Sequence, residues 1–158
     1  MQNWIGIAIW IVMGMVIAFG GLFGFKQWQS WEDNQRQRAS AEFEVMSQLL
    51  QEDQLDSAMS KYQTLKDDYA DSPYASLAAL EMARARLESG QVDLAITLYR
   101  FVSENGKPEA IKMVGVERLA RVLLDQDSPD EALALIEANS SETGFEAALA
   151  EVRGDVFA

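Results

Sequence analysis

The sequence predicts an all-α protein in which one apolar N-terminal helix leads into an array of antiparallel helical hairpins, an α-solenoid. Two observations predict this architecture. The chain repeats its own pattern every 37 residues, and an unbroken run of 22 residues near its start carries no charged side chain. A fixed period of about 20–50 residues is typical of stacked hairpins, because no single unit can bury its apolar face alone.

The repeat is clearest where three segments open in the same way. Residues 56–59 read DSAM, residues 93–96 read DLAI, and residues 130–133 read DEAL. Small residues recur at two positions of this register, and small side chains let neighbouring helices approach closely. We therefore predict that five alanines pack the repeats together: Ala58, Ala83, Ala95, Ala120 and Ala132.

The uncharged run covers residues 4–25 and predicts a transmembrane anchor. A helix of this length spans roughly 33 Å, which is enough to cross the apolar core of a bilayer. Trp4 lies at the start of the run and Trp28 and Trp31 follow its end closely, as aromatic residues do at membrane interfaces. A cleaved signal peptide is the competing interpretation, but residues 1–3 hold no Lys or Arg and no small-x-small cleavage site follows.

Gly20 and Gly24 form a GxxxG pair inside this run. Such a pair lets a second membrane helix approach closely, so it is a candidate transmembrane contact. The alternative is that glycine is common in membrane helices without any partner.

The charges that flank the anchor predict its orientation. Lys26, Arg36 and Arg38 follow the run, and no basic residue precedes it. By the positive-inside rule, these charges place the rest of the chain on the cytoplasmic side.

After a polar joint over residues 26–34, we expect residues 35–158 to form the hairpins. Ser72-Pro73 and Ser128-Pro129 each place a capping residue before a proline at the first helical position. Gly90 can end a helix in the left-handed conformation. Apolar spacing and these turns predict helices over residues 35–50, 55–69, 73–88, 92–102, 109–124 and 130–138.

Residues 144–158 are expected to open a fourth unit. In this unit Val152 corresponds to the large apolar residue, and Gly154 occupies the position of the small one. The sequence then ends before a second helix, whereas a stacked array needs a polar cap, so we expect the natural protein to be longer.

The composition argues against several classes of function. The net charge of −12 lies wholly at or after Lys26, and it disfavours binding to nucleic acid or to anionic lipid. Solubility is the simplest reason for this acidity. The sequence has no Cys and no His, which removes thiolate chemistry and the commonest general base. Residues 125–131 suggest a calcium loop only weakly, since Asp130 and Ile136 replace the required Gly and Glu. We therefore expect no enzyme activity, cofactor, metal or small-molecule substrate.

The repeats and the anchor together resemble the YfgM family, ancillary subunits of the bacterial SecYEG translocon with a tetratricopeptide-like periplasmic domain. The resemblance covers nearly the whole chain. It rests on the anchor followed by LAALEMARARLESGQVDLAITLYRFV at residues 77–102, VERLARVLLDQDSPDEALALIE at 116–137 and ALAEVRGDVFA at 148–158.

The resemblance implies a single-pass protein of the bacterial inner membrane with its C-terminal domain in the periplasm. It also implies two partners, the SecYEG translocon and the membrane-anchored chaperone PpiD. Family members usually carry a charged cytoplasmic segment before the anchor, which would supply the basic residues missing here, and they extend beyond residue 158. The function expected is a scaffold that links SecYEG to periplasmic chaperones. The alternative is a cell-envelope assembly scaffold without translocon contact.

Overall fold

The computed structural model describes residues 34–139 and 146–156, and every regular element within these ranges is an α-helix. The predicted anchor at residues 4–25, with its Gly20–Gly24 pair, lies outside the described residues, as does the joint up to residue 33. Among the described helices, none has the length and apolar character needed to cross a membrane.

The chain divides into two compact units, Met1–Arg38 and Ala39–Ala158. Of the first unit only residues 34–38 are described, and they are helical. The hairpin array belongs to the second unit.

The helices confirm the predicted array. A first helix covers residues 34–51. It is followed by α2 (Leu55–Asp68), α3 (Pro73–Glu88), α4 (Val92–Asn105), α5 (Glu109–Asp125), α6 (Pro129–Ala138) and α7 (Glu146–Val156). The starts of α2, α4 and α6 at Leu55, Val92 and Pro129 are each separated by 37 residues, which is the period found in the sequence.

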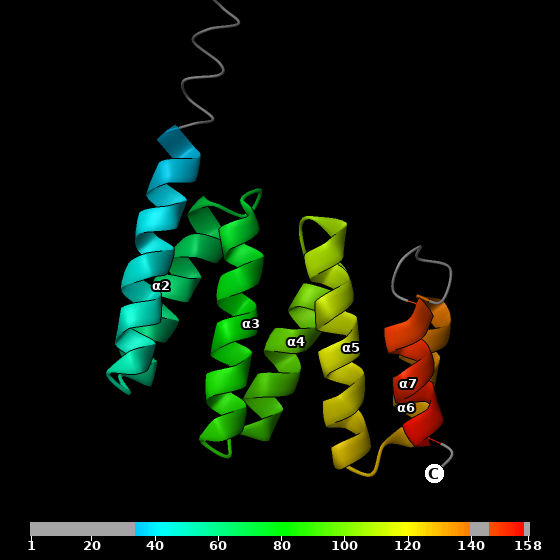
Figure 1. Cartoon of the computed structure of the whole chain (residues 1–158). Helices are drawn as coiled ribbons and strands as arrows, with labels where there is room; N and C mark the ends of the chain where they lie inside the picture. The colour runs from blue at the N-terminus through cyan, green and yellow to red at the C-terminus, as the bar shows by residue number, and fades with distance from the viewer. Residues whose placement is uncertain (1–33, 140–145, 157–158) are drawn as a thin grey trace, which may run out of the picture. The chain divides into compact units, whose positions relative to one another are not determined.

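Within the second unit the helices form two layers (Figure 1). Residues 39–51, α3, α5 and α7 lie in one layer, here called layer A, and α2, α4 and α6 lie in the other, layer B. Contacts run from α2 to α3, α3 to α4, α4 to α5 and α5 to α6, while α7 packs on both α5 and α6. Each repeat is therefore an antiparallel hairpin of one layer A helix and one layer B helix.

The turn inside each hairpin has the same backbone conformation. Asp53, Gly90 and Asp127 stand 37 residues apart and all have positive φ, at 59°, 77° and 55°. In each turn the next amide closes a bond to a carbonyl five residues earlier, which satisfies an otherwise unpaired group at the helix end. The three bonds run from Gln54 to Leu49 (2.9 Å), from Gln91 to Arg86 (2.8 Å) and from Ser128 to Leu123 (2.9 Å).

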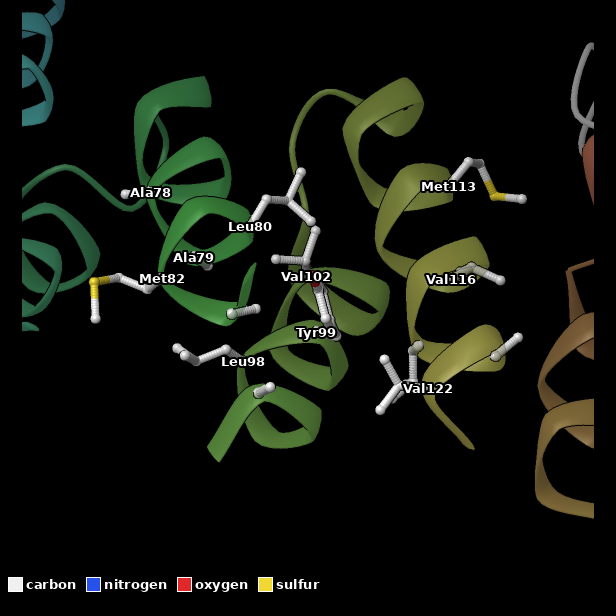
Figure 2. Close-up of a cluster of buried hydrophobic side chains, with 14 of the residues drawn as sticks. Ala78, Ala79, Leu80, Met82, Leu98, Tyr99, Val102, Met113, Val116 and Val122 are labelled. Carbon is white, nitrogen blue, oxygen red and sulfur yellow. The ribbon is translucent and has the colours of Figure 1, made fainter. Parts of the chain in front are cut away.

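The core lies between the layers and follows the same register. Tyr62, Tyr99 and Ile136 are buried at equivalent positions of α2, α4 and α6. Tyr99 and Val102 of α4 lie between α3 and α5 in Figure 2. Since every layer B helix presents the same stripe, each hairpin buries its apolar face against its neighbours.

Gly115 lies at a tight contact between α4 and α5. A β-carbon at this position would lie 2.7 Å from Cγ1 of Val102 and 3.0 Å from the backbone nitrogen of Ser103. Only glycine fits such a contact without a shift of one helix. The sequence analysis did not single out Gly115.

Of the two predicted serine caps, one is confirmed and one is wrong. The hydroxyl of Ser72 accepts a hydrogen bond from the Tyr74 amide at 3.2 Å. Ser128 precedes Pro129 in the same way, but its hydroxyl donates to the Gln126 carbonyl at 3.4 Å and caps nothing. The left-handed turn at Asp127 holds Ser128 at φ −116° and ψ 56°, away from the extended conformation that a capping serine needs.

The position assigned to Gly154 is also wrong. The sequence predicts for Gly154 the position of a small residue packed against a neighbouring helix, as it does for Ala83 and Ala120. Gly154 is exposed, and a β-carbon there would meet nothing within 4 Å. Val152, which is fully buried, anchors this helix to the array.

Candidate functional site

The alanines chosen from the sequence lie inside the array. All five are fully buried: Ala58, Ala83, Ala95, Ala120 and Ala132. Their burial is what a packing role requires, although that role remains a prediction until the residues are enlarged. Because they present no surface, a partner must be bound by other side chains.

The neighbouring helices α3 and α5 of layer A each present a stripe of unburied side chains spaced three and four residues apart. This spacing places the stripe on one side of each helix, opposite the buried positions such as Ala79 and Met82. We call the combined surface the layer A face. It consists of Tyr74, Leu77, Glu81, Arg84 and Glu88 on α3, and of Ile111, Val114, Arg118, Arg121 and Asp125 on α5.

The first half of the layer A face is apolar. Leu77 and Val114 are half-buried and occupy equivalent positions of the two repeats. Tyr74 packs against Phe43 of the first helix, with ring centroids 5.6 Å apart and a tilt of 43°. This half therefore offers apolar and aromatic contact on a backbone that the array holds rigid.

The second half of the face carries three arginines. Arg84 Nε binds Glu88 Oε1 at 2.7 Å, and this hydrogen bond raises the pKa of Arg84. Arg121 binds Glu117 at 2.8 Å and Glu151 of α7 at 3.4 Å. These pairs leave the arginines partly in water, where they can exchange partners at small cost.

Arg118 differs from the other two arginines. It is exposed and makes no ion pair with the described residues. The residue at the equivalent position of the previous repeat is Glu81, whose carboxylate accepts a hydrogen bond from Ser47 at 2.8 Å. Arg118 is thus the charge of this face that is most open to a partner.

The face offers contact rather than reactive groups. Within the described ranges, no three His, Cys, Asp or Glu side chains lie close enough together to hold a metal ion. Hot spots of protein interfaces are enriched in tyrosine and arginine, and this face carries Tyr74 and the exposed Arg118. The sequence analysis expected a binding surface but did not identify which side of the array carries it.

A family model matches almost the whole chain. Residues 2–158 match the model described as a tetratricopeptide repeat-like domain. The match includes both the apolar run and the hairpins. No solved structure matches the chain significantly.

Three similar proteins are each named ancillary SecYEG translocon subunit. The protein of Aggregatibacter actinomycetemcomitans is 30% identical over 146 residues, which are 92% of this chain and 71% of the relative. The protein of Neisseria gonorrhoeae is 28% identical over 153 residues, covering 94% of this chain and 71% of the relative. The protein of Escherichia coli is 24% identical over 145 residues, covering 92% and 69%.

Proposed function

Because this chain belongs to the family of ancillary SecYEG translocon subunits, which has a tetratricopeptide repeat-like domain, we propose that it is a membrane-tethered scaffold of the Sec translocon. In this role its helical surface links SecYEG to a periplasmic chaperone of the PpiD type. The observation that carries the proposal is the similarity to translocon subunits over 92% of the chain. The family model, which matches residues 2–158, spans the apolar run and the repeats together.

The layer A face supports a scaffolding role. Its helices are held from behind by α4 and α6, so a partner meets a preformed surface and loses little ordering entropy on binding. Leu77 and Val114 provide apolar contact. Arg118 provides a positive charge that has no ion-pair partner among the described residues. We propose this face as the site where a partner polypeptide binds.

Membrane placement is part of the same proposal. The run at residues 4–25 would tether the domain to the inner membrane in a single pass, with the repeats in the periplasm. The basic residues after the run favour the opposite orientation. Basic residues on the N-terminal side of the run would reverse this preference.

Co-purification from bacterial membranes tests the proposal. The full chain, extracted in mild detergent, is expected to retain the SecYEG subunits and a membrane-anchored chaperone. Recovery of neither would favour the alternative, a cell-envelope assembly scaffold without translocon contact.

A double variant tests whether the layer A face binds a partner, independently of the translocon role. Leu77→Ser with Arg118→Glu is expected to reduce recovery of at least one partner without lowering the melting temperature. Leu94→Ser is the matched control, since Leu94 is 46% exposed on α4 in layer B. If the double variant recovers both partners as well as the wild type does, the layer A face is not the binding site, whereas the translocon role would stand.

A further inference from the structure

A groove lies outside the layer A face. The last turns of α2 and α4 meet the start of α5 around a groove of about 620 Å³. Lys66, Phe101, Lys107 and Lys112 line it, together with Ser76 and Glu104 among others. The layer A face contributes none of its stripe residues to this groove.

The groove concentrates positive charge in an acidic protein. The chain has five lysines and a net charge of −12, and three of those five lysines line this groove. They come from α2, from the connection before α5 and from α5 itself, so the stacking of three successive hairpins brings them together. Such a cluster attracts carboxylates against the repulsion of the rest of the surface.

The three amines are available to a ligand. Lys66 makes no ion pair with the described residues, and its Nζ lies 5.2 Å from the centre of the Phe101 ring. Lys107 binds Asp71 at 2.6 Å, and Lys112 binds Glu109 at 2.9 Å. Because Asp71 is 95% exposed and Glu109 is 53% exposed, these surface pairs are weak and can be exchanged for a ligand's carboxylates.

The floor of the groove is preorganised. The Phe101 ring packs edge-on against Tyr62, with centroids 6.4 Å apart and planes at 79°. The Lys107 amide donates to the Ser76 hydroxyl at 2.9 Å, and this bond fixes the connection between α4 and α5. These contacts hold the Phe101 ring and the Lys107 backbone in place, and Lys66 lies over the ring.

Two carboxylates in the lining restrict the ligand. Glu104 and Glu109 lie among the lysines, so a compact, highly charged anion would meet negative charge as well as positive charge. An extended peptide reduces this conflict, because its alternate carboxylates face one side and are about 7 Å apart, so each can approach a different lysine. The arrangement therefore favours acidic residues at alternate positions of an extended segment.

We propose that this groove binds an extended acidic segment of a partner polypeptide, with its alternate carboxylates on the lysines. The inference is independent of the translocon role, since it rests on the groove alone. It also assigns the protein a second docking surface, in addition to the layer A face.

Peptide binding to the full chain in detergent tests this proposal. The probe is a fluorescein-labelled, end-blocked peptide of sequence Gly-Glu-Leu-Glu-Gly, and the comparison peptide replaces both glutamates by glutamine. Fluorescence anisotropy at low salt is expected to show about tenfold tighter binding of the acidic peptide, since each exposed charge pair adds only a small increment. Equal affinity for the two peptides would overturn the proposal.

Matched variants locate the binding. The triple variant Lys66→Gln, Lys107→Gln and Lys112→Gln is expected to weaken binding of the acidic peptide about tenfold, while its melting temperature stays close to that of the wild type. Lys61→Gln is the control, because Lys61 lies on α2 outside the groove and pairs with Glu42. Wild-type affinity in the triple variant would refute the site. Displacement of the peptide by inorganic phosphate at equal concentration would instead indicate a phosphate site and would also overturn the proposal.

Discussion

At the scale of single residues, the phenol of Tyr62 reports on the packing between the layers. Its side chain is 5% exposed, and burial, with a smaller contribution from Asp67, raises its pKa to about 12. An unfolded chain has a tyrosine pKa of about 10. Since the folded value is the higher one, the stability contributed by the neutral phenol is complete below about pH 10 and is lost as pH rises towards 12.

The first prediction follows from that shift. The free energy of unfolding of the wild type is expected to fall more between pH 9 and pH 11 than that of Tyr62→Phe, which cannot ionise. Urea denaturation of both proteins at the two pH values measures the difference. Parallel losses in the two proteins would mean that Tyr62 ionises as readily in the folded state as in the unfolded one.

The second prediction compares two glycines whose surroundings leave room for a β-carbon. A β-carbon at Gly90 or at Gly154 would meet nothing within 4 Å, but Gly90 has φ +77°. Gly90→Ala is therefore expected to destabilise by about 1 kcal/mol, because an L-residue is strained in this conformation. Gly154→Ala, inside α7, is expected to be neutral or to stabilise by up to about 1 kcal/mol. Thermal melting measures both, and a loss of stability in both variants would refute the comparison.

At the scale of elements, the role of small residues in packing the hairpins is a prediction. The repeated alanines are buried where layer B helices meet layer A, and Gly115 brings α5 against α4. Arg86 departs from the repeat, because Leu49 and Leu123 occupy the equivalent positions. Its buried guanidinium reaches the start of α2 through the Leu55 carbonyl, at 3.5 Å, and ties successive hairpins together.

The third prediction tests packing at this scale. Ala95→Leu is expected to cost about 1–3 kcal/mol, because the larger side chain cannot fit without moving a helix. Ala110→Leu is the control, since Ala110 is exposed near the start of α5. Chemical denaturation gives both values. Hydrogen exchange should show the loosening in α3, α4 and α5, because contacts in a repeat array are local. Equal stability of the two variants would contradict the packing role.

At the scale of the whole molecule, the fourth prediction concerns the anchor. After carbonate extraction the full chain is expected to remain in the membrane at its uncleaved mass, because residues 4–25 would bury an apolar helix in the bilayer. Immunoblotting of the pellet and the supernatant measures this. Recovery of a shorter, soluble species would indicate a cleaved signal peptide instead.

The fifth prediction concerns the orientation of the chain across the membrane. In cells that make the full-length natural protein, protease added after permeabilisation of the outer membrane is expected to digest the repeat domain. Protection of the domain would place it in the cytoplasm, as the flanking charges favour, and would refute the proposed periplasmic scaffold.

The sequence alone determined the period, the helices and the family. The helix boundaries follow from apolar spacing and turn residues, which act over a few positions, and the period of 37 residues follows from their repetition. Local signals fail where a distant contact or a neighbouring turn decides. Ser128 has the residues of a cap, but the turn at Asp127 prevents capping, and neither Asp53 nor Asp127 is a glycine that would announce a left-handed turn.

The tertiary structure decided which side chains share a surface. Lys66 and Lys112 are far apart in the sequence, and only the stacking of successive hairpins places both of them around Phe101. Likewise, Leu77 and Val114 form one face because two layer A helices lie side by side. The physical reason is that periodicity fixes which side of a helix is buried, whereas the neighbours that cover the remaining sides depend on how the helices pack.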